Sequence, residues 1–249
     1  MNLLVRSPRK GEAHPRDEAA TMSLIEHLED LRRALIISVL AWILCSVAAW
    51  FFTGDILTFI EHRANIGPLA YFGPTGAFMT RLKIAFAAGT LVASPIIFWQ
   101  VWWFVGPGLH ANEKRVVLPL IVATTFFFVL GVSFCFYSLP LIMRVLINFG
   151  NGAGLKFFPV TDDFLGFLLG LCIAFGIVFE MPVVLWTLGM LRIISSRWLW
   201  KQRLYWIIGL GLLANIMTPG ADPLTPLIVF CPLIIFYLGT MLLLRISGR

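Results

Sequence analysis

The sequence predicts an all-α membrane protein that crosses the bilayer six times and keeps both termini in the cytoplasm. Of its 249 residues, 59% are hydrophobic and 13% are charged, whereas soluble domains average about 25% charged residues. Six long apolar stretches follow one another along the chain, and most basic residues fall on one side of them. Backbone polar groups cannot stay unpaired in hydrocarbon, so stretches of this length are expected to be helices.

The ordered part is predicted to be one domain over residues 22–249, after a disordered cytoplasmic tail over residues 1–21. The tail is polar, mixed in charge and lacks the apolar core of a signal peptide. Residues 23–33 are expected to form an amphipathic helix at the cytoplasmic interface, because their leucines recur with a helical period. Ser23 and Glu26 have the spacing of a capping box, which predicts that the helix begins at Ser23.

The six spans are predicted at 34–53, 82–106, 116–139, 163–188, 204–218 and 223–243. The fifth is short, because about 14 residues at 1.5 Å each reach roughly 21 Å against a hydrocarbon core of about 30 Å. Pro226 and Pro232 predict that the sixth is bent or short.

The predicted loops and interfaces follow from the residues between the spans. An aromatic-rich external segment after the first span is expected to cap the bundle, and residues 148–159 are expected to form a second external loop. Trp99, Trp102 and Trp103 end the second span and predict an aromatic belt at the headgroups. The four cysteines lie in apolar segments and are expected to be small core residues.

The basic residues predict the orientation. Fourteen of the 19 fall on the side that holds both termini, at positions 6, 9, 10, 16, 32, 33, 114, 115, 192, 197, 201, 203, 245 and 249. This is the positive-inside pattern, so that side is predicted to be cytoplasmic. The net charge of +6 is therefore explained by topology and does not indicate nucleic-acid binding.

Four short motifs, in order along the chain, resemble those of the TatC family. Residues 26–33, E-H-L-E-D-L-R-R, resemble the family's N-terminal signature, with Asp30 at its glutamate position and Ala34 where a second basic residue is common. The others are the exit of the second span with the loop N-E-K-R around Glu113, F-E-M-P around Glu180, and T-P-G-A-D-P around Asp222. Together they extend from residue 22 to about residue 240.

This resemblance implies the receptor subunit of the twin-arginine translocase in the cytoplasmic (inner) membrane. Such a subunit binds twin-arginine signal peptides of folded precursor proteins at the cytoplasmic face and organises their transport, which the protonmotive force drives. The implied partners are TatA and TatB, or a TatA-like subunit, in a multimeric complex with membrane lipids. No cofactor, metal, nucleic acid or enzymatic activity is implied.

A pair of arginines requires carboxylates, which form charge-assisted and sometimes bidentate bonds with guanidinium groups. Glu113 is the first candidate and Asp30 the second, with Glu29 as a residue that could share the role of the shorter Asp30. The alternative for Glu113 is a solvated charge paired with Lys114, which contributes under about 1 kcal/mol. The alternative for Asp30 is an exposed helical pair with Arg33.

Three further side chains are candidates for the same site. Arg32 cannot bind an arginine and is expected to orient the acidic pair or to bind a lipid phosphate. His27 is either an interfacial polar residue or a direct contact of the peptide. Gln100, among the tryptophans, either contributes to the peptide groove or caps a neighbouring helix.

Two further candidate features, Glu180 and the Asp222–Pro223 pair, are predicted away from this site. Glu180 is the one charge-capable side chain deep in a predicted span, at a cost of about 3 kcal/mol if charged. It is expected either to dock a partner helix or to be protonated and hydrogen-bonded inside the bundle. Asp222 and Pro223 are expected to be the cap and first residue of the sixth helix.

Two other functions were weighed against this one. A proton-coupled transporter of a small solute would use Glu180 as its carrier group, but that class usually has internal repeats and several intramembrane ionisable residues. A membrane enzyme is disfavoured because the histidines lie outside the cores of the spans and no catalytic motif is present in the sequence.

Overall fold

The computed structural model describes residues 15–105, 117–152, 154, 156–191, 193–217 and 225–246. Within them the helices, in chain order, are α1 (Pro15–Trp50), α2 (Thr53–Ala64), α3 (Gly76–Val105), α4 (Val117–Gly152), α5 (Thr161–Phe179), α6 (Met181–Met190), α7 (Ser196–Lys201), α8 (Arg203–Met217) and α9 (Thr225–Ile246).

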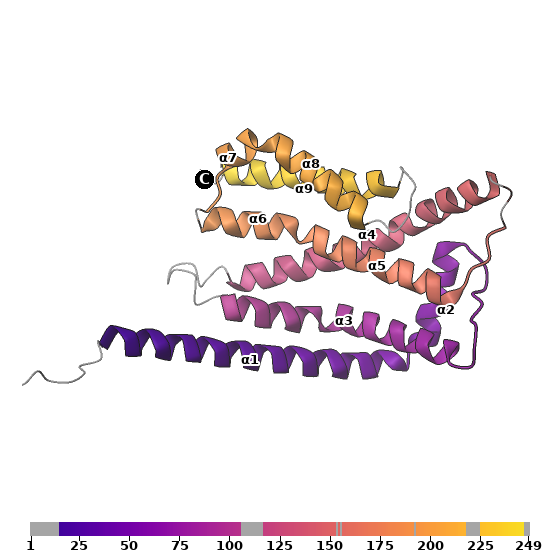
Figure 1. Ribbon diagram of the computed structural model, residues 1–249, viewed down its shortest axis with the longest axis horizontal. Helices are drawn as coiled ribbons and strands as arrows, with labels where there is room; N and C mark the ends of the chain where they lie inside the picture. The colour runs from indigo at the N-terminus through magenta and orange to yellow at the C-terminus, as the bar shows by residue number, and fades with distance from the viewer. Residues whose placement is uncertain are drawn as a thin grey trace, which may run out of the picture.

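The long helices lie side by side along the long axis of the molecule (Figure 1). α1 packs on α3, α3 on α4, α4 on α5, and α9 on both α6 and α8. We call the end that holds the starts of α1, α4 and α8 and the ends of α3, α6 and α9 the proximal end. The opposite, distal end holds α2 and the starts of α3 and α5, so both described chain ends belong to the proximal end.

Five helical segments are long and apolar enough to cross a membrane, and they are Ile25–Trp50, Gly76–Val105, Val117–Gly152, Thr161–Met190 and Pro226–Ile246. A sixth apolar helix, Arg203–Ile216, is shorter. The chain is therefore an all-α, multi-pass membrane protein. α8 has 15 residues and reaches about 22 Å, so it is short as predicted. α9 has 22 residues, or about 33 Å, so by length it is not short.

α1 begins earlier than the sequence predicted. It starts at Pro15 and continues without a break into the first span. Ser23 therefore lies inside the helix, and the predicted capping box is wrong. Residues 15–21, expected to belong to a disordered tail, are helical, because proline is tolerated in a first turn and the following acidic and alanine residues are compatible with a helix.

α2 was missed as a helix. Its residues were taken for part of a loop because Gly54 suggested a turn, yet a glycine in a first turn is tolerated and Asp55 beside it favours a helix start. Ile60 and Ala64 are buried, so α2 covers the distal end as the cap that the aromatic residues suggested. It ends at Asn65, whose φ of 54° is left-handed.

α3 and α4 both extend further at the distal end than predicted. α3 begins at Gly76, and α4 continues through Pro140 to Gly152, so residues 148–152 of the expected second loop are helical. Proline costs a helix a hydrogen bond. Ile142 and Met143 lie buried in the core immediately afterwards, and this packing offsets the loss.

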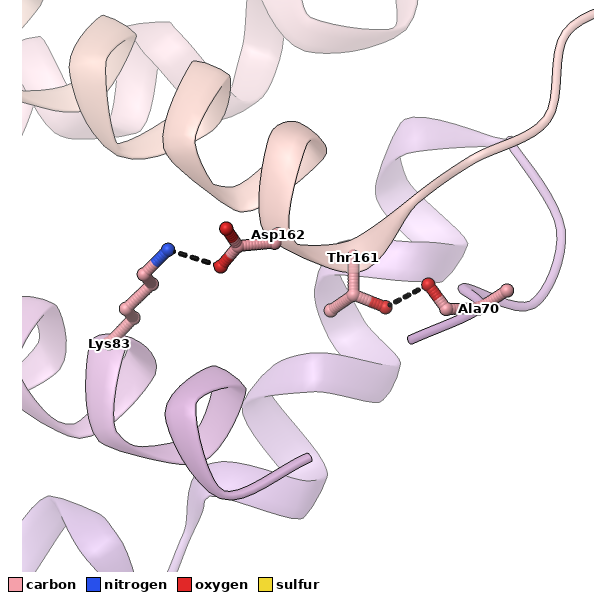
Figure 2. A network of polar contacts seen from close by, with 4 residues as sticks. All are labelled: Ala70, Lys83, Thr161 and Asp162. Atoms are coloured by element: carbon pink, nitrogen blue, oxygen red, sulfur yellow. Dashed lines mark hydrogen bonds and ion pairs between the residues drawn. The ribbon is translucent and has the colours of Figure 1, made fainter. Parts of the chain in front are cut away.

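The distal end is tied together by polar contacts between segments far apart in sequence (Figure 2). The Thr161 hydroxyl and N–H both donate to the carbonyl of Ala70, at 2.9 and 2.8 Å. Lys83 on α3 forms an ion pair with Asp162 on α5. The N–H of Leu69 donates to Glu61 Oε1 at 3.1 Å. The loop after α2 is therefore fixed against the start of α5.

The fourth predicted span is interrupted at Glu180, between α5 and α6. The Glu180 carbonyl accepts hydrogen bonds from the N–H groups of Val183 and Val184, at 3.1 and 3.0 Å. Pro182 stands in the first turn of α6, where its missing N–H is tolerated. Glu180 therefore sits at a helix junction rather than on a regular helical face.

Candidate functional site

The candidate site lies where α1 and α3 meet at the proximal end. These two helices approach closely along their length, since a Cβ built on Gly89 would lie only 2.6 Å from Ser46 Cα. The Trp42 indole N–H donates to Thr90 Oγ1 at 2.9 Å, which fixes the register of the two helices. The position of one helix therefore determines the position of the other.

At the proximal end this register brings His27 onto Phe104. Their ring centroids lie 4.3 Å apart with an angle of 19° between the planes, a stacked arrangement. His27 comes from the amphipathic segment of α1, and Phe104 is next to the last residue of α3. The contact therefore joins the first family-like motif to the exit of the second predicted span.

By the helical period, the acidic candidates Asp30 and Glu29 lie on different sides of α1. At about 100° per residue, Asp30 follows His27 by nearly one turn and lies on the same side of α1. Glu29 is about 160° from His27 by the same count and points away from α3. The buried Ala34, two turns from His27, marks the face toward α3. Of the two carboxylates, Asp30 is thus the one on the side of α1 that carries His27.

Arg32 and Arg33 lie on α1 beyond the acidic pair and are exposed. By helical count Arg32 is on the side away from α3, which argues against the predicted role of orienting Asp30. Within the described residues, neither arginine comes within ion-pair distance of Asp30 or Glu29. The predicted alternative of an Asp30–Arg33 pair is therefore not formed, and the Asp30 carboxylate is exposed without a charged partner there.

Gln100 is half-buried on α3, one turn deeper than Phe104 and on the same side of the helix. Its amide makes no hydrogen bond to the described part of the chain. The predicted alternative, in which it caps a neighbouring helix, has no contact to support it. By helical count Gln100 therefore shares the face of α3 that meets His27 at the seam between α1 and α3.

The exit of α3 is held by Trp102, which is 8% exposed and donates its indole N–H to Thr124 Oγ1 of α4 at 3.2 Å. It also packs with Val183 of α6. Trp99 and Trp103 are exposed. Trp99 and Trp103 therefore remain candidates for the predicted aromatic belt, whereas Trp102 is a core residue, because consecutive helical residues point about 100° apart.

Three predicted residues lie outside the described part of the chain, and they are Glu113, Asp222 and Pro223. Val105 and Val117, which flank the segment that contains Glu113, both belong to the proximal end (Figure 1). The structure brings His27 into contact with Phe104. By helical count Asp30 shares the side of α1 that carries His27 and Gln100 the side of α3 that carries Phe104, whereas Glu29 and Arg32 lie on other sides of α1.

Glu180 forms a second, separate feature in the interior. Both of its carboxylate oxygens are buried, and neither has a hydrogen-bond partner in the described ranges. Its neighbour Phe179 packs on Phe236 of α9, with ring centroids 4.7 Å apart. The expected alternative of a carboxyl group hydrogen-bonded inside the bundle therefore finds no partner there.

Sequence reasoning missed Phe104 and the Trp102–Thr124 contact. Phe104 follows Gln100 by four residues, so their shared face could have been read from the helical period. Nothing in the local pattern, however, indicates that α1 is the helix that this face meets. The contact depends on the packing of two helices far apart in sequence.

Known proteins match most of the length of this chain. Residues 26–232 match the family described as Sec-independent protein translocase protein (TatC). The TatC of Carboxydothermus hydrogenoformans is 38% identical over 223 residues, which are 88% of this chain and 91% of that protein. The TatC of Aquifex aeolicus is 32% identical over 92% of this chain and 97% of its own.

Solved structures agree with the sequence match. A crystal structure titled twin arginine translocase receptor TatC superposes with a TM-score of 0.75 at 30% identity, covering 90% of this chain and all of that one. A second crystal structure of that receptor, in the detergent DDM, gives a TM-score of 0.76 at 31% identity, covering 88% and 99%.

Proposed function

Because the chain belongs to the TatC family of Sec-independent protein translocase proteins, we propose that it binds twin-arginine signal peptides of folded precursor proteins at its proximal end. The chain is a translocase protein of a membrane and not an enzyme. The similarity to translocase receptors favours this function over the transport of a small solute with Glu180 as carrier.

The observation that carries the proposal is the seam formed by His27, Phe104 and Gln100, with the Asp30 carboxylate beside it and without a charged partner in the described ranges. An arginine guanidinium binds a carboxylate through two parallel hydrogen bonds. It also stacks on aromatic faces, which Phe104 and His27 supply. These two chemistries are the ones that a peptide with two arginines needs.

Two carboxylates are required because one exposed ion pair contributes under about 1 kcal/mol. We assign Asp30 to one arginine and Glu113 to the other. Glu113 lies outside the described residues, between α3 and α4, and the end of α3 and the start of α4 both belong to the proximal end. Lysine would not replace arginine well at such a site, because its ammonium group cannot make the bidentate bond.

The proximal end is assigned to the cytoplasm of a cell whose inner membrane holds the protein. The support is the distribution of charge, because exposed basic residues of this end include Arg32, Arg33, Arg197, Lys201 and Arg245. Loops rich in lysine and arginine remain cytoplasmic. Both termini would then lie on the same side as the precursor.

We assign the docking of partner subunits to α8, which is too short to cross the hydrocarbon core by itself. α8 falls about 8 Å short of a 30 Å hydrocarbon core. Such a mismatch is relieved by thinning the bilayer or by covering it with other helices. TatA and TatB, or a TatA-like subunit, would dock there and at the buried carboxyl of Glu180, and the protonmotive force would drive transport by the complex.

Site-specific crosslinking tests the site. A photoreactive benzoylphenylalanine replaces Phe104 at the proximal end or, as a matched control, the exposed Phe72 at the distal end. We expect a signal peptide with Arg-Arg to crosslink at position 104 and not at 72, and the Lys-Lys peptide to lose the crosslink. Equal labelling at both positions would reject the proposed site.

A further inference from the structure

A cleft at the distal end lies between the last turn of α2 and the part of α4 that continues beyond its predicted end at 139. Its volume is about 160 Å³, and Asn65, Arg144 and Asn148 contribute the polar part of its lining, with Met143 and Ile147 among the apolar part. This volume is small for a drug-sized ligand, whose pockets span about 300–1,000 Å³. The cleft suits a compact polar group with an apolar attachment.

The charge of the cleft is positive. No residue of its lining is acidic, and the Arg144 guanidinium has no ion pair or hydrogen bond to the described part of the chain. Nearby on the same seam, Arg63 Nη2 donates to the Tyr137 carbonyl at 3.3 Å, so a second guanidinium lies against α4. In the cleft itself, the guanidinium of Arg144 and the carboxamides of Asn65 and Asn148 offer donors for an anion.

In the described part of the chain, no acidic side chain forms an ion pair with either of these arginines. Glu61 accepts the Leu69 N–H, and Asp162 pairs with Lys83. Asp55 stands in the first turn of α2, at the opposite end of that helix from Asn65. Within the described part of the chain, Arg144 therefore has no anionic partner.

The level of the cleft relative to the hydrocarbon core indicates where an anion for the cleft comes from. Counting from Val117, about 20 helical residues cross a 30 Å hydrocarbon core, so α4 leaves it near position 137. Tyr137, which is 73% exposed, is the residue expected at that boundary. Arg144 follows two turns later, and helical side chains lean toward the N-terminus, which for α4 means back toward the membrane. The guanidinium of Arg144 therefore lies at the level of the headgroups.

We propose that the cleft formed by Asn65, Arg144 and Asn148 binds the phosphate of an anionic phospholipid in the leaflet at the distal end. The guanidinium of Arg144 binds the phosphate oxygens in a bidentate manner, and the two amides bind the remaining headgroup oxygens. The acyl chains follow the exposed apolar surface of α4 below the cleft, where Leu141 and Tyr137 face outward. This site lies at the opposite end of the bundle from the arginine-pair seam and does not depend on it.

Native mass spectrometry of the full chain in detergent tests the proposal. Phosphatidylglycerol and phosphatidylcholine are titrated against the wild type, Arg144→Gln and the control Arg81→Gln, which removes an exposed arginine of α3 outside the cleft. We expect Arg144→Gln to lower the apparent affinity for phosphatidylglycerol roughly tenfold, as losing a charge-assisted bond does. Phosphatidylcholine, whose choline cation offsets the phosphate charge, should bind the wild type more weakly and lose less affinity in Arg144→Gln than phosphatidylglycerol does.

Two further measurements distinguish a lipid phosphate from a soluble phosphate and control for misfolding of the Arg144→Gln variant. Millimolar glycerol phosphate at constant ionic strength should not displace the lipid, and displacement would mean that the site takes soluble phosphate, which contradicts the proposal. Asn148→Leu keeps all charges and should also weaken phosphatidylglycerol binding. An unchanged affinity in Arg144→Gln, or an equal loss in Arg81→Gln, would overturn the proposal.

Discussion

The imidazole of His27 stacks on the ring of Phe104, with 4.3 Å between their centroids, and so couples the start of α1 to the end of α3. His27 belongs to the amphipathic segment that also carries Asp30, and Phe104 directly precedes the last residue of α3. The chain leaves α3 there toward the segment that contains Glu113. The stack therefore fixes the segment of α1 that carries Asp30 against the end of α3.

His27→Ala should weaken binding of the twin-arginine peptide several-fold while leaving the fold intact. An aromatic stack contributes about 0.5–1.5 kcal/mol, which corresponds to roughly 2- to 13-fold in affinity. His27→Phe keeps the stack and should restore binding. Peptide affinity is measured by fluorescence anisotropy on the purified chain. If His27→Phe is as weak as His27→Ala, the imidazole itself contacts the peptide and the stack is not its main role.

Gly89→Ala should lower the melting temperature clearly. A Cβ there would meet Ser46 Oγ at 2.1 Å and the Ser46 backbone at 2.6 Å, so α1 and α3 would be forced apart. Overpacking of this kind costs about 1–3 kcal/mol. Gly166→Ala on α5, which would meet nothing within 4 Å, is the matched control and should melt at or above the wild-type temperature. Equal melting of the two variants would contradict the close approach.

The polar contacts of Figure 2 should differ in their contributions. Thr161 is 4% exposed, and Thr161→Val removes its hydroxyl bond to Ala70 at a cost of about 1 kcal/mol. Lys83 and Asp162 are 38% and 68% exposed, so Asp162→Asn should cost well under 1 kcal/mol. Thermal melting in the same detergent compares the two variants. A larger loss from Asp162→Asn would mean that the ion pair, not the buried hydroxyl, holds the distal end.

Glu180→Leu should leave the isolated chain as stable as the wild type or more stable. Both carboxylate oxygens are buried without a partner in the described ranges, so no hydrogen bond there is lost. Co-purification with a TatB-like subunit should nevertheless fall, because the proposed docking group is gone. A marked loss of thermal stability with normal co-purification would instead indicate a structural role inside the bundle.

The spans were predictable from the sequence because hydrocarbon admits few alternatives to an apolar helix. Helix ends at the two faces were harder to predict. The first and third spans were predicted to end at 53 and 139, yet α2 begins at Thr53 and includes Gly54, and α4 continues past Pro140. In each case burial of neighbouring side chains, such as Ile60 and Ile142, outweighs the local preference.

The candidate site was predictable only in part. The motif around His27 and Asp30 is readable in one segment, and the helical period alone separates Asp30 from Glu29. The sequence does not predict that His27 stacks on Phe104, because this contact depends on how α1 and α3 pack. For the same reason the sequence could not tell that Trp102 turns into the core while Trp103 remains exposed.

The central claim is that paired carboxylates at the proximal end recognise two arginines. Its most direct measurement is the affinity of the purified full chain for a signal peptide with Arg-Arg and for the same peptide with Lys-Lys. The variants are Asp30→Asn, Glu113→Lys and, as the matched control on the other side of α1, Glu29→Gln.

The account predicts that the wild type binds the Arg-Arg peptide at least roughly tenfold more tightly, a difference of about 1.4 kcal/mol. Glu113→Lys should abolish that preference, Asp30→Asn should reduce it, and Glu29→Gln should leave it intact. Equal affinity of the wild type for the two peptides, or an unchanged preference in Glu113→Lys, would contradict the account.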